Sequence, residues 1–284
     1  MIFKARKRVL GGGESRVLLY SSLFLLCALL ISMPGRAETR RVDGLEFTRI
    51  LVHGNVEVEV SQGAETELEV RGSSGDLDKQ PFFLKDDTLV LGRSVNRKNH
   101  FGRVRYKVTA VELEQLQLNG SGEVYVKPLR VNDLYVSVDG SGDIKIFEVR
   151  GRNLTIRVAG SGDIQVADLF AEDVRLLMSG SGDIHVKKLE AENVEVSLSG
   201  SGDISVHDQG QCSSVDINIA GSGDIDFEVL KTLSAEVNIM GSGTVKVDAT
   251  DYLEVNTMGS GDVYYYGSPD VEQSVLGSGD VSRQ

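Results

Sequence analysis

From residue 120 onwards, short runs of alternating apolar and polar residues follow one another at a nearly constant distance. In the unit that begins at Gly180, apolar residues occupy alternate positions in 184–186 and again in 194–198. Alternation over short runs rich in β-branched residues is typical of half-buried β-strands. Each unit therefore predicts two strands, one after a Gly-Ser-Gly-Asp segment and one before the next such segment.

The Gly-Ser-Gly segment itself recurs in steps of 18 to 21 residues. It begins at residues 120, 140, 160, 180, 200, 221, 241, 259 and 277. Two strands and two bends per unit would build either a hairpin meander or a coil. We favour the coil, a β-solenoid, because stacked copies of one unit keep the same neighbours, whereas a meander gives odd and even strands different ones. Glycine suits a sharp corner in which a Cβ would meet the copy above.

Residues 38–119 are less regular but carry similar alternating runs. These runs lie at 47–50, 56–60, 67–70 and 88–91, and segments 53–55 and 72–76 resemble decayed corners. We therefore interpret 38–119 as irregular first coils of the same solenoid, with a wider cross-section, and 120–284 as its regular repeats. Terminal coils are expected to be atypical because one of them must cap the core.

The first 37 residues predict a signal peptide. Five basic residues within 1–16 precede an apolar stretch at 17–33, and Gly35 and Ala37 are the small residues that a signal peptidase requires. The alternative is an uncleaved signal anchor, since the apolar stretch is at the lower limit for crossing a bilayer. We favour cleavage, and we expect no membrane span in the mature chain.

Charge and cysteine content narrow the function classes. Removing residues 1–37 takes away six basic residues and one acidic residue, which changes the formal net charge from −12 to −17. This acidity argues against binding to nucleic acid or anionic lipid. Cys212 is the only cysteine left in the mature chain, so no intramolecular disulfide can form, and we expect a small buried side chain there.

The corner aspartates suggest two roles. They are Asp143, Asp163, Asp183, Asp203 and Asp224. Such an Asp usually accepts hydrogen bonds from nearby backbone N–H groups, which is the interpretation we favour. The alternative is calcium binding, because stacked carboxylates repel one another and a cation would relieve the repulsion. One carboxylate per turn is few for calcium, and Glu123 and Thr244 replace Asp in two units.

No catalytic, cofactor or zinc site is predicted. The corner serines are nine equivalents, whereas a catalytic serine needs a base and an oxyanion site at one place. The mature histidines, His53, His100, His185 and His207, have no zinc-site spacing, and we expect them on the surface. A polysaccharide-active β-helix enzyme is the less favoured alternative, because 120–284 contains no insertion long enough to form a cleft with clustered acids.

One basic cluster interrupts the acidic chain. It consists of Arg93, Arg97, Lys98, Arg103, Arg105 and Lys107. A long solvated hairpin is the simpler interpretation. The other is a docking surface for an acidic glycan or for the acidic flank of another copy.

Several segments together carry a family resemblance. Gly44-Leu45-Glu46-Phe47 with 56–63, then 87–89, then 113–124 resemble the head GIN domain family of auto-transporter adhesins over residues 44 to about 221. The resemblance implies a right-handed, single-stranded parallel β-helix in a bacterial cell envelope, with a role in adhesion and no catalytic residues. Because 277–284 stops inside a repeat, we expect a periplasmic or envelope location, with an extracellular one as the alternative.

Two functions remain open. The first is an adhesion module that binds a glycan or an envelope protein. The second is a structural scaffold that forms homo-oligomers through the unpaired edge of the C-terminal coil. Tyr264, Tyr265 and Tyr266 lie near that edge, and alternation predicts that Tyr265 points inward.

Overall fold

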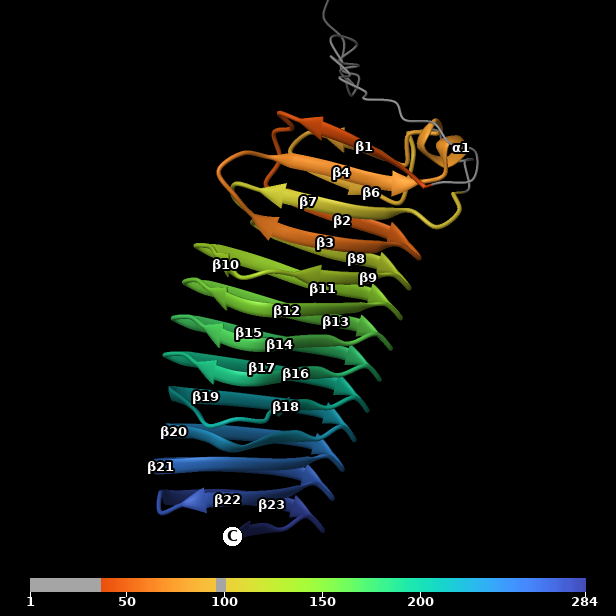
Figure 1. Ribbon diagram of the computed structural model, residues 1–284. Helices are drawn as coiled ribbons and strands as arrows, with labels where there is room; N and C mark the ends of the chain where they lie inside the picture. Colours follow the sequence, from red (N-terminus) through yellow and green to blue (C-terminus); the bar gives the residue numbers. More distant parts are fainter. Residues whose placement is uncertain (1–36, 96–100) are drawn as a thin grey trace, which may run out of the picture. The chain divides into compact units, whose positions relative to one another are not determined.

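The computed structural model describes residues 37–95 and 101–284, which form a β-solenoid (Figure 1). The predicted signal peptide lies outside the described residues, apart from Ala37. Equivalent strands of successive units pair in parallel, and residues 173–180 pair one for one with 193–200. The prediction of a coil rather than a meander is confirmed. Within the described residues, no helix has the length and apolarity needed to cross a membrane.

Each coil contributes one strand to each of two faces. Face A holds the strands that lead into a corner: β2 (Arg49–Gly54), β6 (Thr88–Leu91), β8 (Gln115–Gly120), β11 (Asp133–Gly140), β13 (Asn153–Gly160), β15 (Asp173–Gly180), β17 (Asn193–Gly200), β19 (Gly210–Gly221) and β23 (Asp270–Gly277). Face B holds the strands that follow a corner and those that pair with them: β3 (Glu57–Gln62), β7 (Arg105–Ala110), β9 (Glu123–Val126), β10 (Leu129–Arg130), β12 (Asp143–Arg150), β14 (Ile164–Phe170), β16 (Ile184–Glu190), β18 (Ile204–Val206), β22 (Asp262–Gly267) and β24 (Val281–Arg283). Two long strands, β20 (Ile225–Gly241) and β21 (Thr244–Gly259), run from face B round to face A.

The core is a set of stacked apolar columns between the two faces. Ile164, Ile184 and Ile204 are register partners and are fully buried. Cys212 is buried, as predicted, and burial raises the pKa of its thiol to about 11. Tyr265 packs against the core, which confirms that it points inward.

Glycine is required at both corner positions, for two different reasons. Gly180 has φ +135°, a conformation that L side chains rarely adopt, and a Cβ there would lie 2.1 Å from the carbonyl oxygen of Gly160. Gly182 needs no special φ, but its Cβ would lie 2.0 Å from the carbonyl oxygen of Gly162. Close stacking of coils at the corner therefore excludes every side chain.

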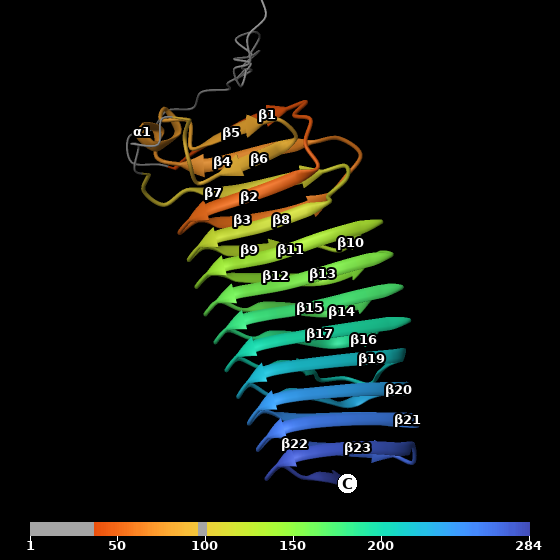
Figure 2. The same cartoon turned by 180° about the vertical axis from the view of Figure 1, so that it is seen from behind.

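The N-terminal region joins the same stack but does not follow chain order (Figure 2). Strands β6 and β7 pair with β2 and β3 on one side, whereas β8 and β9 pair with them on the other. Three further strands lie here: β1 (Glu38–Asp43), β4 (Glu67–Gly72) and β5 (Phe82–Lys85). The pairs β1–β4, β4–β7 and β5–β6 are antiparallel, so this region is not a simple continuation of the coil.

The two segments interpreted as decayed corners have different outcomes. Gly54 has φ +79° and pairs with Gly120, so 53–55 is a corner. Segment 72–76 is not, because it leads into the one-turn helix α1 (Ser74–Leu77), where the backbone N–H of Asp76 donates to Ser73 Oγ (3.2 Å). A serine followed by an acid three positions later is a helix N-cap pattern that outweighed the glycines.

One regular coil is interrupted at the only 21-residue step. Strand β18 ends at Val206, and the next coil position that faces the core is Gly210, which pairs with Leu230. In the preceding coil three residues separate Val186 from Leu189, whereas four separate Val206 from Gly210. The extra residue therefore lies in 207–209, on face B.

Candidate functional site

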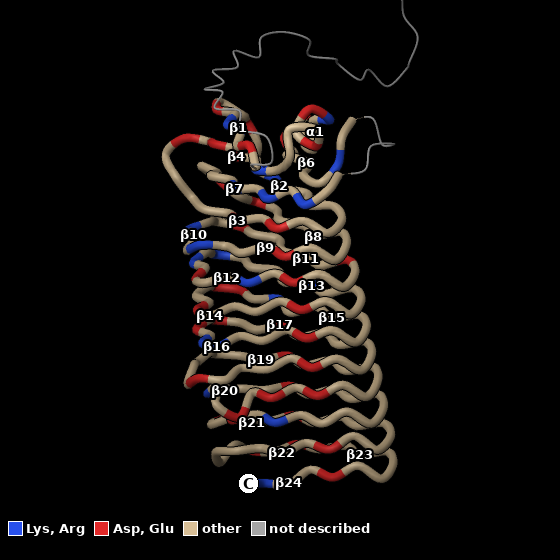
Figure 3. Tube along the Cα trace, turned by 45° about the vertical axis from the view of Figure 1, so that its right-hand side comes forward, with Lys and Arg blue, Asp and Glu red and all other residues tan. Residues whose placement is uncertain are grey.

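The corner carboxylates form a column along the stack, and Figure 3 shows acidic positions beside successive corners. The backbone N–H of Asp203 donates to Asp183 Oδ1 (2.9 Å), and the same bond recurs between the other neighbouring corner aspartates. Above Glu123 and Thr244 the bond changes: the N–H groups of Asp143 and Asp262 donate to the carbonyls of Gly122 and Gly243. The carboxylate thus replaces a backbone acceptor, which is the structural role favoured from the sequence.

The calcium alternative has no further support in the described part of the chain. One oxygen of each of Asp143, Asp163, Asp183, Asp203 and Asp224 already accepts a backbone N–H. No group of three or more His, Cys, Asp or Glu side chains among the described residues could hold a metal ion. Calcium binding by this column stays a prediction.

The basic cluster is divided by the fold. Arg97 and Lys98 lie outside the described residues. Arg105 Nε lies 2.7 Å from Glu57 Oε2, and Lys107 is the register partner of Glu59 and Glu69. Arg93 lies near His53, where burial and this positive charge lower the pKa of the imidazole. Two of the predicted docking residues are thus interleaved with acids on face B rather than gathered into one positive surface.

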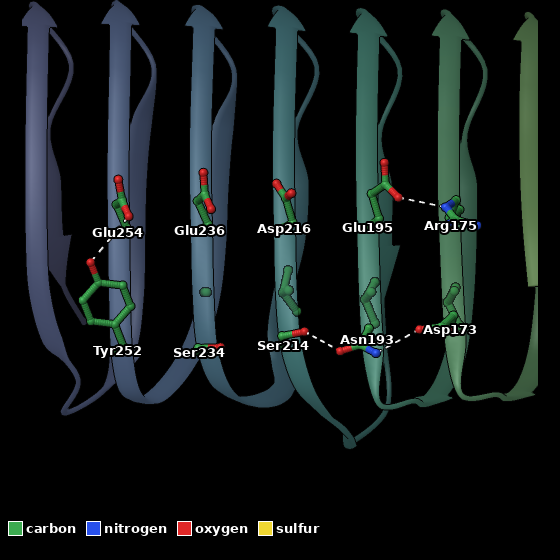
Figure 4. Close-up of a pocket in the computed structure, with 14 residues that line it drawn as sticks. Asp173, Arg175, Asn193, Glu195, Ser214, Asp216, Ser234, Glu236, Tyr252 and Glu254 are labelled. Atoms are coloured by element: carbon green, nitrogen blue, oxygen red, sulfur yellow. Dashed lines mark hydrogen bonds and ion pairs between the residues drawn. The ribbon is translucent and has the colours of Figure 1, made fainter. Parts of the chain in front are cut away.

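A groove of about 390 Å³ lies on the outer surface of face A and crosses five coils (Figure 4). Two rows of outward side chains line it. One row holds Asp173, Asn193, Ser214, Ser234 and Tyr252, and the other holds Arg175, Glu195, Asp216, Glu236 and Glu254. The residues of each row are strand neighbours in register, so the spacing along the row is about 4.8 Å per coil.

The second row is a column of carboxylates. Arg175 Nε bonds Glu195 Oε2 (2.9 Å), but no printed ion pair neutralises Asp216, Glu236 or Glu254 within the described chain. Partial burial and the neighbouring charge of Glu236 raise the pKa of the Asp216 carboxyl. The groove therefore carries a negative charge that a neutral or cationic ligand would tolerate.

Asparagines beside this column hold the carboxylates in place. Asn218, Asn238 and Asn256 stack on adjacent coils, and Asn238 Nδ2 donates to Asn218 Oδ1 (3.3 Å) and to Glu236 Oε1 (3.0 Å). Asn256 repeats the pattern with Glu254 (3.1 Å) and Asn238 (3.2 Å). The outer surface is thus a ladder of acceptors and donors with fixed orientation, suited to hydroxyl groups.

The first row is also hydrogen bonded from coil to coil. Ser214 Oγ donates to Asn193 Oδ1 (2.8 Å), and Asn193 Nδ2 donates to Asp173 Oδ1 (2.9 Å). Tyr252 Oη lies 3.5 Å from Glu254 Oε2 and supplies the one aromatic ring in the groove. The sequence analysis did not identify this groove, because its residues differ in type from coil to coil and only the register aligns them.

A second polar group lies on face B, at the interrupted coil. His185 Nδ1 is 2.7 Å and His207 Nε2 is 3.2 Å from Ser205 Oγ, and the two rings are 5.5 Å apart. Asp183 Oδ2 lies 3.7 Å from His185 Nε2. His185 is partly exposed and His207 exposed, whereas His53 is half-buried and His100 lies outside the described residues. The 21-residue step was the sequence signal that could have pointed here.

This group contains the residue types of a Ser-His-Asp hydrolase but lacks its geometry. Ser205 is only 8% exposed. The backbone N–H groups of His207 and Asp208 donate to the carbonyls of Val186 and Lys187. They are therefore not available to stabilise an oxyanion, which acyl transfer requires.

A row of apolar side chains follows the asparagine ladder towards the corners of face A. Met240, Met258 and Leu276 are register partners and are 61%, 57% and 65% exposed. Neighbouring exposed apolar side chains of this kind are typical of contact surfaces.

Comparisons with known proteins agree with this architecture. The sequence profile of the family described as "Putative auto-transporter adhesin, head GIN domain" matches residues 46–208 and 152–269. A crystal structure from Parabacteroides distasonis described as a "putative lipid binding protein" is 27% identical, with a TM-score of 0.63 over 88% of this chain and 98% of that one. Among curated proteins, none matches this chain.

Two further crystal structures are similar in fold. A "putative adhesin" from Parabacteroides distasonis is 24% identical, with a TM-score of 0.66 over 88% of this chain and 98% of that one. A "putative adhesin" from Parabacteroides merdae is 20% identical, with a TM-score of 0.64 over 88% and 97%. At these identities the likeness concerns the solenoid alone.

Proposed function

Because this chain belongs to the head GIN domain family of auto-transporter adhesins, we propose that it is an exported, non-enzymatic binding module of the bacterial cell envelope. Its ligand is a glycan that lies in the face A groove. The observation that carries the proposal is the pair of polar rows that repeat over five coils. A linear polymer laid across the strands would meet a similar pair of side chains at each coil.

The chemistry of the rows favours sugar hydroxyls. Carboxylates accept hydrogen bonds, amides both accept and donate, and the Asn238 and Asn256 side chains are already oriented by their neighbours. Tyr252 offers an amphipathic ring with a polar tip. A groove with fixed side chains loses little conformational entropy on binding, which helps a weakly held, extended ligand.

Charge selects among glycans. Arg175 is the one basic residue among the lining residues, whereas Asp173, Glu195, Asp216, Glu236 and Glu254 are acidic. Repulsion should disfavour acidic polysaccharides here and favour neutral or amino-containing ones. An acidic glycan would instead select the basic residues near β7, which is the other location expected from the sequence.

A glycan array and titration test this proposal. The groove variant carries Asp216→Asn, Glu236→Gln and Tyr252→Ala, and a matched control carries Asp168→Asn on face B. We expect saturable binding to a neutral or amino-containing glycan that falls at least tenfold in the groove variant and not in the control. Loss only in an Arg103→Glu, Lys107→Glu variant would move the site to the basic residues.

The exposed apolar row favours a second candidate function, a self-associating envelope scaffold. Met240, Met258 and Leu276 would pair with the same row on another copy. Sedimentation velocity of the protein and of a Met240→Gln, Met258→Gln, Leu276→Gln variant tests it, and a monomer at high concentration in both would exclude it. Flotation with liposomes is a useful third measurement, since one similar structure is described as a lipid-binding protein.

A further inference from the structure

The histidine group on face B is built from residues that the register brings together. His185 and Ser205 are direct partners on β16 and β18, and His207 follows Ser205 by two positions, so both histidines lie on the outer side of the face. The backbone N–H of His207 donates to the Val186 carbonyl (3.1 Å), which fixes the start of the interrupted segment. Two imidazoles from adjacent coils thus approach one point from opposite sides.

That point is occupied by a single hydroxyl. Ser205 Oγ lies 2.7 Å from His185 Nδ1 and 3.2 Å from His207 Nε2. A hydroxyl has one hydrogen and can donate to only one of the two nitrogens. The other nitrogen therefore donates to Oγ or is unsatisfied, and neither arrangement uses both imidazole lone pairs.

Asp183 determines which nitrogen of His185 faces this point. Its Oδ2 lies 3.7 Å from His185 Nε2, which favours the proton on Nε2 and leaves the lone pair of Nδ1 directed at Ser205. A carboxylate behind the imidazole is the arrangement that orients histidines bound to metals. The remaining oxygen of Asp183 is held by the backbone N–H of Asp203 (2.9 Å), so the carboxylate is itself fixed.

The geometry points to a surface site in which His185 Nδ1 and His207 Nε2 chelate one divalent transition-metal ion. Imidazole suits Cu²⁺, Ni²⁺ and Zn²⁺, and metal–nitrogen distances of about 2.0–2.1 Å require only that the two rings close on the position near Ser205 Oγ. Water completes the coordination, since the described chain supplies no third His, Cys, Asp or Glu ligand. A site with two protein ligands binds reversibly, most tightly to Cu²⁺.

The metal site is independent of the glycan groove, because the two lie on different faces. Its position at the one interrupted coil also separates it from the repeated corner carboxylates. In every other complete repeat, the positions equivalent to Ser205 and His207 hold residues other than histidine, except His185 itself.

Calorimetric titration of the full-length protein with CuCl₂ and ZnCl₂ tests the site, with His185→Gln and His207→Gln as the lesions. We expect one equivalent of Cu²⁺ that either variant weakens at least tenfold and that His53→Gln leaves unchanged. Ser205→Ala should keep or strengthen binding, because the hydroxyl occupies the metal position. Electron paramagnetic resonance of the Cu²⁺ complex should show two coordinating nitrogens.

Thermal melting without metal separates folding from binding, and all three histidine variants should melt as the unmodified protein does. Binding that is absent, or that neither His185→Gln nor His207→Gln weakens in a folded protein, overturns the proposal. Binding lost in Ser205→Ala with both histidines intact would also overturn it, since the hydroxyl would then be the ligand.

Discussion

The regular coils and the interrupted coil share one corner and two faces but differ at four residues. In the coil of β16, Leu189 fills the core column and Lys187 faces solvent at the position that precedes it by two. In the next coil Gly210 occupies the leucine position, and the extra residue pushes 207–209 outward. The comparison teaches that repeated residues serve stacking, whereas residues that occur once are free to serve chemistry.

The corner column shows how strongly stacking dominates the repeated positions. Where Glu123 or Thr244 stands in place of Asp, the next N–H donates to a glycine carbonyl instead. The coil is therefore maintained by two interchangeable acceptors. A repeated aspartate is in this case a structural device, and its repetition is no evidence for a ligand.

The largest expected effect is at the corner glycines. Gly180→Ala should lower the free energy of unfolding by at least about 3 kcal/mol, because the new Cβ adds an unfavourable φ to a 2.1 Å contact with a backbone oxygen. Urea denaturation followed by circular dichroism measures this. Gly75→Ala in α1, where no atom lies within 4 Å of the added Cβ, is the control and should be neutral or stabilising.

The core columns come next. Leu189→Ala should cost about 2–5 kcal/mol, as for a fully buried leucine whose neighbours cannot close the cavity. Cys212→Ala, in the interrupted coil, removes one sulfur atom and should cost about 1 kcal/mol. Equal losses in the two variants would show that the interrupted coil is packed as tightly as the regular ones.

The sequence was sufficient for the fold because the same physical requirement repeats. Alternation in 184–186 and 194–198, with glycine at 180 and 182, already specifies two strands and a close corner. It could not specify the order of strands near the N-terminus, since each of β4, β5 and β6 has several possible edges to pair with. Pairing there is decided by contacts between segments far apart in the sequence.

The candidate sites were less predictable for a related reason. Tyr252, Glu236 and Asp216 share a groove only because three coils of 18 to 21 residues come into register. His185 and His207 are 22 residues apart, which matches no metal-binding spacing within one strand or helix. Aligning the repeats by their corners and asking where one step differs would have found the second site.

A smaller effect is expected at the corner aspartates. Asp183→Ala removes the acceptor for the Asp203 N–H, but the carbonyl of Gly182 can replace it, as in the coils above Glu123 and Thr244. We expect a loss of about 1 kcal/mol or less. Asp183→Thr copies Thr244 and should be closer to neutral, so a large loss in both would show that the carboxylate has another role.

The smallest effect concerns charge in the groove. Burial and Glu236 raise the pKa of Asp216 in the folded protein above its unfolded value. A carboxyl with a raised folded pKa contributes stability that is present below the unfolded pKa and lost as pH rises through the folded pKa. At pH 7 the charged Asp216 is therefore a cost, and Asp216→Asn should raise the melting temperature slightly, by a free energy of about a few tenths of a kcal/mol.

The pH dependence gives this prediction its sign. The advantage of Asp216→Asn should shrink as pH falls from 7 towards 4, because protonation removes the same charge from the unmodified protein. Asn218→Ala provides the opposite perturbation: it deletes the Nδ2 donor to Asp216 Oδ1 (2.8 Å), which lowers the pKa, and should steepen the loss of stability with rising pH. Melting curves of the three proteins that run parallel between pH 4 and 7 would mean that solvent screens the column completely, and the groove would then have no charge preference to offer a ligand.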